Sequence, residues 1–345
     1  MMKLFDLVMN ASRCSQGVKL KGGEIVTLER GTIIDEHVLR STIPSHFIRI
    51  DNILDELGKR DEKRFFVYRT FSLGDVLMLV PAIRYLREKG YDAYMKTIGE
   101  YTDIVRRLDV PVVESFYNTQ NDLGIIFDYV IEQDHSNSKL CRYHRTHLYL
   151  SAMGIEDLPE YVDWSSKLEN FIDVPFDLPE YYVVFQAQGS NIVKQLPAET
   201  ILKIAKRLND QGIFVYFIGK PSDLDFQNKL TVNLGLRSLK CAQLFTLIAH
   251  ARMLLCVDSS PLWISHFTQT PVACILGPTN FKQRLTLHPF YPDGTIPIQL
   301  NELMNCDSCF EMKQRCDGKV SCFNQDSEKV ADFVIHKIAN FLEGS

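Results

Sequence analysis

Two stretches in which strand patterns alternate with helix patterns restrict the fold of this chain more than any other feature. In the first stretch, strand patterns fall at 64–69, 91–96 and 125–131, and helix patterns fall at 76–89 and 141–153. A glycine follows each of these helix patterns, where it can end the helix. Strands separated by helices form parallel sheets with crossover helices, so this stretch predicts an α/β domain.

The alternation resumes after a proline-bearing stretch at 171–179, which we interpret as a linker. The strand patterns there are 181–186, 213–218, 253–257 and 271–276, and the helix patterns are 197–211, 242–251, 261–268 and 327–342. Two α/β halves joined by a short linker indicate a cleft between them. We predict domains at 61–172 and 173–345, with ligands bound at the carboxyl ends of their strands.

The first 60 residues have a different, irregular pattern. Gly22 and Gly23 precede an alternating run at 24–28, which is typical of a half-buried strand, and Gly31 follows as a turn signal. We predict that residues 1–60 form a small β-rich N-terminal module.

The composition of the 345-residue chain excludes several classes of protein. Hydrophobic residues make up 46% and charged residues 23%, which is ordinary for a soluble globular protein and excludes a wholly disordered or fibrous one. The net charge of −5 disfavours a nucleic-acid partner and an anionic membrane surface. No apolar stretch reaches the roughly 18 residues of a membrane span, and the first 11 residues match a signal peptide poorly. We expect a cytoplasmic protein without a transmembrane segment.

In each of the two predicted domains, a polar loop follows the first strand. The first contains Gly74 and Asp75 at a helix start, where Asp75 is either a capping residue or a general base. The second contains Gly189, Ser190 and Lys194, a glycine- and serine-bearing turn with a nearby ammonium group. This composition suits a diphosphate, and it equally suits an ordinary loop between a strand and a helix.

Two further loops follow strands in the second predicted domain. One consists of Asp258, Ser259, Ser260 and Pro261, and the other of Gly277, Pro278 and Thr279. Hydroxyl and N–H groups at a helix start can bind an anion, although Ser-Ser-Pro is also a strong capping sequence. Asp258 could accept hydrogen bonds from sugar hydroxyls. The convergence of four such loops on one cleft favours a binding site over capping alone.

In their order and their positions at strand ends, these motifs resemble those of glycosyltransferase family 9, the heptosyltransferase-like group. The matching residues run from about Arg64 to the C-terminus and are Ser72-Leu73-Gly74-Asp75-Val76 with Pro81-Ala82, Gly189-Ser190 with Lys194 and Pro197, Asn233-Leu234-Gly235, Asp258-Ser259-Ser260-Pro261, and Gly277-Pro278-Thr279. The resemblance implies a GT-B fold, in which two Rossmann-like domains face a cleft. It also implies sugar transfer from a nucleotide donor, often an ADP-heptose, with inversion and without a catalytic metal.

The resemblance also implies roles for individual residues. Asp75 would be the base, Lys194 and the helix start at 259–261 would hold the diphosphate, and Asp258 would bind the donor sugar. Gly74, Ser190, Gly277 and Thr279 complete the predicted substrate-binding set. The sequence departs from the family pattern in having Ser260 for a usual glycine, Trp263 for a usual histidine, and Gln195 where a second basic residue is frequent.

Four of the nine cysteines fall in one short polar segment, at Cys306, Cys309, Cys316 and Cys322. A C-x2-C pair with two nearby thiols suits a tetrahedral metal, and a metal crosslink would order a segment that cannot fold by apolar burial. We predict a structural zinc or iron site. Disulfides, which are less favoured in the cytoplasm, and free thiols are the alternatives. Related cysteines occur in many family members, and the resemblance extends to the branch that glycosylates autotransporter proteins, for which a metal is reported there.

A basic stretch without acidic residues runs from 135 to 155 and contains Arg142, His144 and Arg145. It is either a solvated helix face or a positively charged surface for an anionic acceptor. The resemblance places the matching region in the acceptor domain.

These observations predict an inverting glycosyltransferase that moves a heptose-like sugar from a nucleotide sugar, expected to be ADP-linked, to a hydroxyl of a protein or glycan. One alternative is a glycosyltransferase acting on a hydroxymethylated DNA base, which the net charge disfavours. The other is a non-catalytic binding or assembly protein on the same scaffold. The sequence leaves the acceptor and the oligomeric state open.

Overall fold

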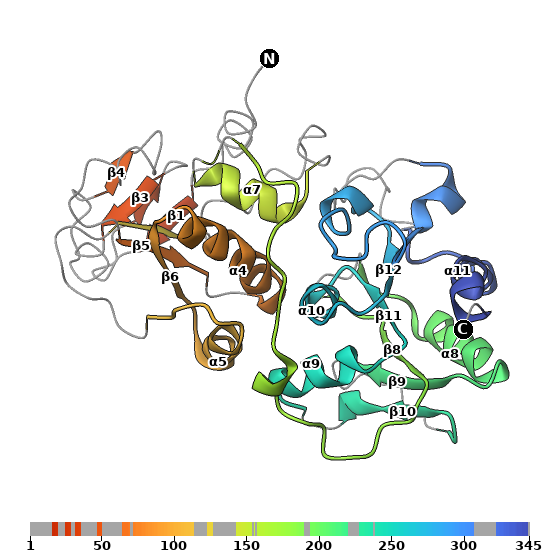
Figure 1. Ribbon diagram of the computed structural model, residues 1–345. Coiled ribbons are helices and arrows are strands. Elements are labelled where there is room, and N and C mark those ends of the chain that lie inside the picture. Colours follow the sequence, from red (N-terminus) through yellow and green to blue (C-terminus); the bar gives the residue numbers. More distant parts are fainter. Residues whose placement is uncertain are drawn as a thin grey trace. The chain divides into compact units, whose positions relative to one another are not determined.

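The chain divides into two compact units, and the boundary in the sequence falls between Asp163 and Trp164, ahead of the stretch interpreted as a linker (Figure 1). We describe each unit by itself. The computed structural model describes residues 16–19, 25–28, 32–35, 47–49, 64–69, 72–113, 123–126, 143–153, 155, 157–189, 194–219, 228–236, 239–306 and 322–343.

Unit 1 contains a five-stranded sheet with the strand order β4-β3-β7-β5-β6. The three strands β5 (Arg64–Tyr68), β6 (Asp92–Lys96) and β7 (Leu123–Ile126) are parallel, with β5 in the centre. They occupy or overlap the three strand patterns of the first stretch. The predicted parallel α/β arrangement is therefore confirmed for this part of unit 1.

The first 60 residues contribute to this sheet as well as forming a separate hairpin. Strands β3 (Thr32–Asp35) and β4 (Phe47–Arg49) are antiparallel, and β3 pairs with the edge of β7. Strands β1 (Gln16–Lys19) and β2 (Ile25–Leu28) form a two-stranded sheet of their own. The predicted β-rich character is present, but two strands extend the main sheet and cover its β7 edge, which would otherwise expose unpaired backbone groups.

The helices of unit 1 are α4 (Leu73–Glu88), α5 (Gly99–Arg107) and α7 (Arg145–Ala152). Helix α4 begins three residues earlier than its apolar pattern suggests, because the carbonyl of Ser72 accepts the N–H of Val76 at 3.1 Å. Asp75 therefore lies within the first helical turn and not in a preceding loop. Gly90, with φ of +87°, follows the helix as predicted.

Unit 2 contains a six-stranded, fully parallel sheet with the order β10-β9-β8-β11-β12-β13. The strands are β8 (Tyr182–Gln186), β9 (Phe214–Ile218), β10 (Thr231–Asn233), β11 (Met253–Val257), β12 (Val272–Leu276) and β13 (Thr295–Gln299). Every residue of β8, β11 and β12 is buried, as expected for parallel strands covered on both faces.

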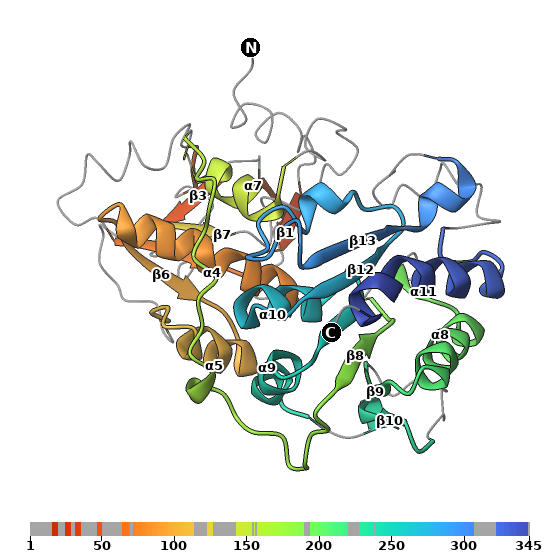
Figure 2. The same ribbon diagram turned by 45° about the vertical axis from the view of Figure 1, so that its right-hand side comes forward.

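Helices cover both faces of this sheet (Figure 2). Helices α8 (Ala198–Asp210) and α11 (Ser327–Glu343) pack against each other and share one core with the strands, while α9 (Cys241–Ala249) and α10 (Ser260–Thr268) form the other layer. Apolar side chains such as Ile204 and Val334 belong to that core together with Phe185 and Leu255. No helix in the described parts of the chain is long and apolar enough to cross a membrane.

The strand order of unit 2 determines where its site forms. The order reverses between β8 and β11, which is the position where open α/β sheets bind ligands. Because β8, β11 and β12 are neighbours, the segments that follow them begin side by side. These segments contain three of the four loops selected from the sequence, at 186–197, 258–261 and 277–279.

An aromatic cluster in unit 2 encloses two histidines. The ring centroids of His266 and His288 are 4.6 Å apart, and Trp164 lies 4.7 Å from His266. Burial lowers the pKa of His288 to about 4, and it lowers the pKa of His266 well below its usual range. Both imidazoles are therefore neutral in the folded protein at neutral pH.

The His288 imidazole makes stability depend on pH. The unfolded chain takes up its proton as the pH falls below 6.5, whereas the folded protein does so near pH 4, so the contribution is fully present above 6.5 and is lost toward 4. When the pH is lowered from 7 to 5, the unfolding free energy of both proteins should fall. We expect the fall to be about 2 kcal/mol smaller for His288→Asn than for the wild type. Urea denaturation at the two pH values measures this. The control is His250→Asn, which changes an exposed histidine and should lose as much unfolding free energy as the wild type. Equal losses for His288→Asn and the wild type would contradict a lowered pKa of His288.

Candidate active site

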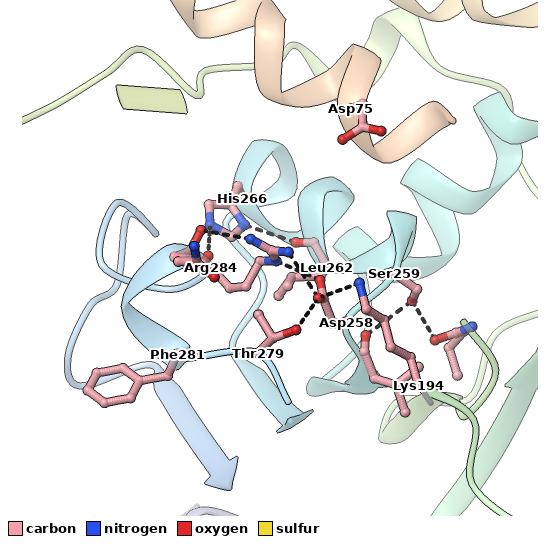
Figure 3. A network of polar contacts seen from close by, with 12 residues as sticks. Asp75, Lys194, Asp258, Ser259, Leu262, His266, Thr279, Phe281 and Arg284 are labelled. Atoms are coloured by element: carbon pink, nitrogen blue, oxygen red, sulfur yellow. Dashed lines mark hydrogen bonds and ion pairs between the residues drawn. The ribbon is translucent and has the colours of Figure 1, made fainter. Parts of the chain in front are cut away.

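The carboxylate of Asp258, at the end of β11, is the centre of a buried polar network in unit 2 (Figure 3). Arg284 donates to it twice, from Nε to Oδ1 at 2.7 Å and from Nη2 to Oδ2 at 3.0 Å. Nζ of Lys194 lies 3.0 Å from Oδ2, and the hydroxyl of Thr279 donates to the same oxygen at 2.9 Å. The network thus joins residues that follow β8, β11 and β12.

The charges of this network favour an anion. Burial by itself would raise the pKa of Asp258, which is only 7% exposed, but Arg284 and Lys194 together hold that pKa well below its usual range. Asp258 is therefore ionised, and the two cations around it leave a net charge of +1. Positive charge in a region of low dielectric constant attracts an anion more strongly than it would in water.

The backbone on both sides of Lys194 fixes its position. The N–H of Gly189 donates to the carbonyl of Lys194 at 3.0 Å, and the N–H of Leu196 donates to Ala187 at 3.0 Å. The side chain of Gln195 donates to the carbonyl of Gly189 at 2.8 Å. A Cβ atom on Gly189 would lie 2.8 Å from Cβ of Lys194 and 3.0 Å from its carbonyl oxygen, so only glycine allows this approach.

The start of helix α10 lies directly after Asp258. Ser259 is the N-cap residue, but its hydroxyl donates to Oε1 of Gln186 at 2.6 Å, and the carbonyl oxygen of Val257, 3.1 Å away, is an alternative acceptor. The side chain of Ser259 makes no capping hydrogen bond to the first turn of α10. Its backbone N–H groups and the helix dipole therefore add to the positive potential near Asp258.

Gly277, predicted to bind substrate, has a packing role in this structure. The space that a Cβ atom would occupy is filled by Phe323 and Cys322, at 2.7 Å and 2.9 Å from the ideal Cβ position. The neighbouring Thr279 does belong to the polar network, through its bond to Asp258. The loop after β12 thus connects the network to the segment that contains the last of the four clustered cysteines.

In unit 1, two side chains hold the carboxylate of Asp75, which is 22% exposed. Nη2 of Arg69, at the end of β5, lies 2.5 Å from Oδ2, and the hydroxyl of Tyr149 in α7 donates to Oδ1 at 3.3 Å. Burial and the charge of Asp75 raise the pKa of Tyr149 to about 12, so the phenol keeps its proton. A partly exposed carboxylate with a fixed orientation can accept a proton from a hydroxyl that reaches it.

The basic stretch of unit 1 is neither a solvated face nor an open charged surface where it is described. His144 is 1% exposed, and its Nδ1 accepts the N–H of Thr146 at the start of α7. Arg145 is 8% exposed, and its guanidinium carbon lies 5.7 Å from the ring centroid of Tyr149. The sequence showed the charges of these side chains but not that their helix packs into the unit.

Several predicted residues lie outside the described parts of the chain: Ser190, Arg142, Cys309 and Cys316. Of the four clustered cysteines, Cys306 is exposed and Cys322 is buried. Among the described residues, no three His, Cys, Asp or Glu side chains are grouped closely enough to hold a metal ion.

Three site residues were missed in the sequence, namely Arg69, Tyr149 and Arg284. Arg69 ends a predicted strand six residues before Asp75, so its position at a strand end was an available signal. Tyr149 and Arg284 are 74 and 26 residues from the carboxylates they contact, and no motif marks either of them.

The Gly189→Ala substitution tests the geometry around Lys194. The added methyl group would displace the Lys194 backbone, and we expect a loss of about 1–3 kcal/mol of unfolding free energy. Weaker binding of inorganic pyrophosphate, measured by calorimetry, should accompany this loss. Gly212→Ala is the control, because Gly212 has a φ of +77° with nothing within 4 Å of its Cβ position and reports backbone strain alone. Unchanged pyrophosphate binding in Gly189→Ala would show that Lys194 is not held in this way.

Comparisons with known proteins agree with this architecture. Residues 82–317 match the sequence model of glycosyltransferase family 9 (heptosyltransferase), whereas no curated protein matches the chain. The structure resembles a family 9 glycosyltransferase from Veillonella parvula DSM 2008, with a TM-score of 0.56, 14% identity, and coverage of 82% of this chain and 98% of the other.

Two further solved structures show the same fold at 14% identity and a TM-score of 0.55. One is the iron-containing dodecameric glycosyltransferase TibC from enterotoxigenic E. coli H10407, with 82% of this chain and 77% of that chain covered. The other is E. coli ADP-heptose LPS heptosyltransferase II, with 80% and 99% covered. The predicted α/β fold with parallel sheets, as in GT-B glycosyltransferases, is confirmed. The chain belongs to glycosyltransferase family 9.

Proposed function

We propose that this protein is an inverting glycosyltransferase that moves a heptose-like sugar from an ADP-linked donor to an acceptor hydroxyl. The observation that carries the proposal is the network in which Lys194 and Arg284 share the buried carboxylate of Asp258, because its net positive charge suits a nucleoside diphosphate. TibC was also solved with ADP-D-β-D-heptose, and heptosyltransferase WaaC of E. coli, at a TM-score of 0.51, was solved with ADP. These relatives support an ADP-linked donor.

The proposed reaction is a single displacement at the anomeric carbon. The acceptor hydroxyl attacks this carbon while Asp75 takes its proton, and the bond to the nucleoside diphosphate breaks with inversion of configuration. Negative charge then develops on the leaving diphosphate. The ammonium of Lys194 and the first N–H groups of α10 stabilise that charge, without any need for a catalytic metal in the proposed step.

Asp258 has a different role in this proposal from the one the resemblance implied. Its two oxygens already accept hydrogen bonds from Arg284 and Thr279 and contact Lys194. A donor sugar would have to compete with these partners. We therefore assign Asp258 to the support of the diphosphate site and not to direct recognition of sugar hydroxyls.

The proposed acceptor is a hydroxyl group of a protein or a glycan. The net charge of −5 disfavours DNA as an acceptor. A non-catalytic scaffold is disfavoured by the partners of Asp75, since Arg69 and Tyr149 keep an ionisable side chain partly exposed and oriented. Assembly into oligomers, as described for TibC, is open to test by light scattering.

A structural metal in the four-cysteine segment is part of the proposal. Four thiolates form a donor set suited to zinc or iron, and Cys306 and Cys322 bound the segment at an exposed and a buried position. When bound, the metal would supply order and not chemistry. Because Cys322 packs against Gly277, a metal bound to this segment would also help to hold the loop that contains Thr279.

The Asp75→Asn substitution tests the proposed base. We expect release of ADP from ADP-heptose to fall by about 10²- to 10⁴-fold, because Asn cannot accept the proton. The increase in melting temperature caused by ADP should be unchanged, because Asp75 does not hold the nucleotide. Asp92→Asn, at an exposed ion pair with Arg87 in the same unit, should keep wild-type activity. ADP release by Asp75→Asn within about threefold of wild type would remove Asp75 from the mechanism.

Elemental analysis tests the metal. Purified protein should contain about one zinc or iron per chain, and replacement of all four clustered cysteines by serine should abolish it and lower the melting temperature. Cys256→Ser, which changes a buried cysteine of β11, serves as the control and should retain the metal. Less than about half an atom per chain in the wild type would argue against the site.

A further inference from the structure

Arg284 is the member of the Asp258 network that no motif predicts. It follows the short helix η6 (Phe281–Gln283), and its guanidinium is buried. Nε and Nη2 donate to different oxygens of Asp258, at 2.7 Å and 3.0 Å, which is the bidentate geometry of a strong ion pair. The guanidinium carbon lies 5.8 Å from the ring centroid of Trp263, so an aromatic surface also supports it (Figure 3 labels Arg284 and Asp258).

The charge of Arg284 changes what Lys194 can do. Without Arg284, the ammonium of Lys194 and the carboxylate of Asp258, 3.0 Å apart, would form an ion pair with no net charge. Such a pair has little attraction for a diphosphate, because Asp258 would compete with the ligand for Lys194. With Arg284 on both oxygens, the carboxylate is already neutralised and the positive charge of Lys194 remains available.

We propose that Arg284 is a positioning residue that neutralises Asp258 and thereby keeps the charge of Lys194 available for a diphosphate. The identity of the anion as the diphosphate of the donor rests on the proposed function. Arg284 acts through Asp258, so its effect is removed when that carboxylate is removed. This dependence separates an electrostatic role from simple support of the fold.

Three variants test the proposal by charge rescue. Arg284→Met removes one cation and leaves the network neutral. Asp258→Asn combined with Arg284→Met also removes the anion, so the net charge is again +1, on Lys194. Arg284→Lys keeps the positive charge but has fewer hydrogen-bond donors. The ligands are inorganic pyrophosphate and ADP, and calorimetry measures their dissociation constants. We expect Arg284→Met to weaken pyrophosphate binding by about 10- to 100-fold.

The double variant should bind pyrophosphate at least about tenfold more tightly than Arg284→Met does, although it has lost more hydrogen bonds. Arg284→Lys should fall between wild type and Arg284→Met. A purely structural role for Arg284 predicts the opposite order, since deleting both partners would damage the network further. The matched control is Arg207→Met, which breaks ion pairs with Glu328 and Asp332 on the surface of α8 and α11 and should bind like wild type.

Folding is monitored separately by thermal unfolding, because removing one member of a buried ion pair destabilises a protein strongly. The double variant contains neither charge of the Arg284–Asp258 pair, so it leaves no unpaired charge from that pair. It therefore provides a test even if Arg284→Met fails to fold. The proposal is overturned if Arg284→Met binds pyrophosphate within about twofold of wild type, or if the double variant binds no better than Arg284→Met. It is also overturned if wild-type protein does not bind pyrophosphate.

Failure of the proposed function would give a different result. In that case pyrophosphate binding would follow the charge-rescue order, while no nucleotide sugar released its nucleotide with any acceptor. The inference about Arg284 would then stand for an anion site of another purpose. Conversely, unchanged binding in Arg284→Met together with activity lost in Asp75→Asn would refute the inference and leave the glycosyltransferase proposal intact.

Discussion

The ion pair between Arg284 and Asp258 is the interaction on which the arrangement of the unit 2 site depends. A carboxylate buried to this extent loses most of its hydration, and only close cations with good geometry compensate for that loss. Asp258 itself follows β11, and the compensation comes from residues after the two neighbouring strands, since Lys194 follows β8 and Thr279 and Arg284 follow β12. A single charge thus ties three loops together, and the parallel order of β8, β11 and β12 makes this geometry available.

In unit 1, a cation also holds a carboxylate, but more of that carboxylate is exposed. Asp75 is held by Arg69 and Tyr149 but keeps 22% of its side chain exposed, whereas the side chain of Asp258 is 6% exposed. A carboxylate that must receive a proton needs access to the reacting group, while one that only balances charge can be fully enclosed. The degree of burial of each aspartate therefore fits its proposed role, although both are held by an arginine.

Sequence patterns were sufficient for the features that depend on local periodicity. The strand at 253–257 and the helix at 327–342 were predicted nearly to the residue, because burial of parallel strands and of one helix face leaves a regular apolar pattern. The pairing of β3 with β7 and the contacts of Tyr149 and Arg284 were missed, because they join segments far apart in the chain and leave no periodic trace. Likewise, charge composition did not reveal that His144 and Arg145 are buried. Their polarity suggested solvent, but Nδ1 of His144 accepts a backbone N–H inside the unit and the guanidinium of Arg145 lies over an aromatic ring.

The departures from the family pattern acquire a physical meaning in this network. Gln195 stands where a second basic residue is frequent, and its amide donates to the carbonyl of Gly189, so it fixes the Lys194 loop in place of adding charge. Trp263 stands where a histidine is usual, and it is buried beneath the guanidinium of Arg284. An aromatic surface at this position supports an arginine, and that arginine supplies the second cation that Gln195 does not. Lys194 and Arg284 together then supply the positive charge of the site.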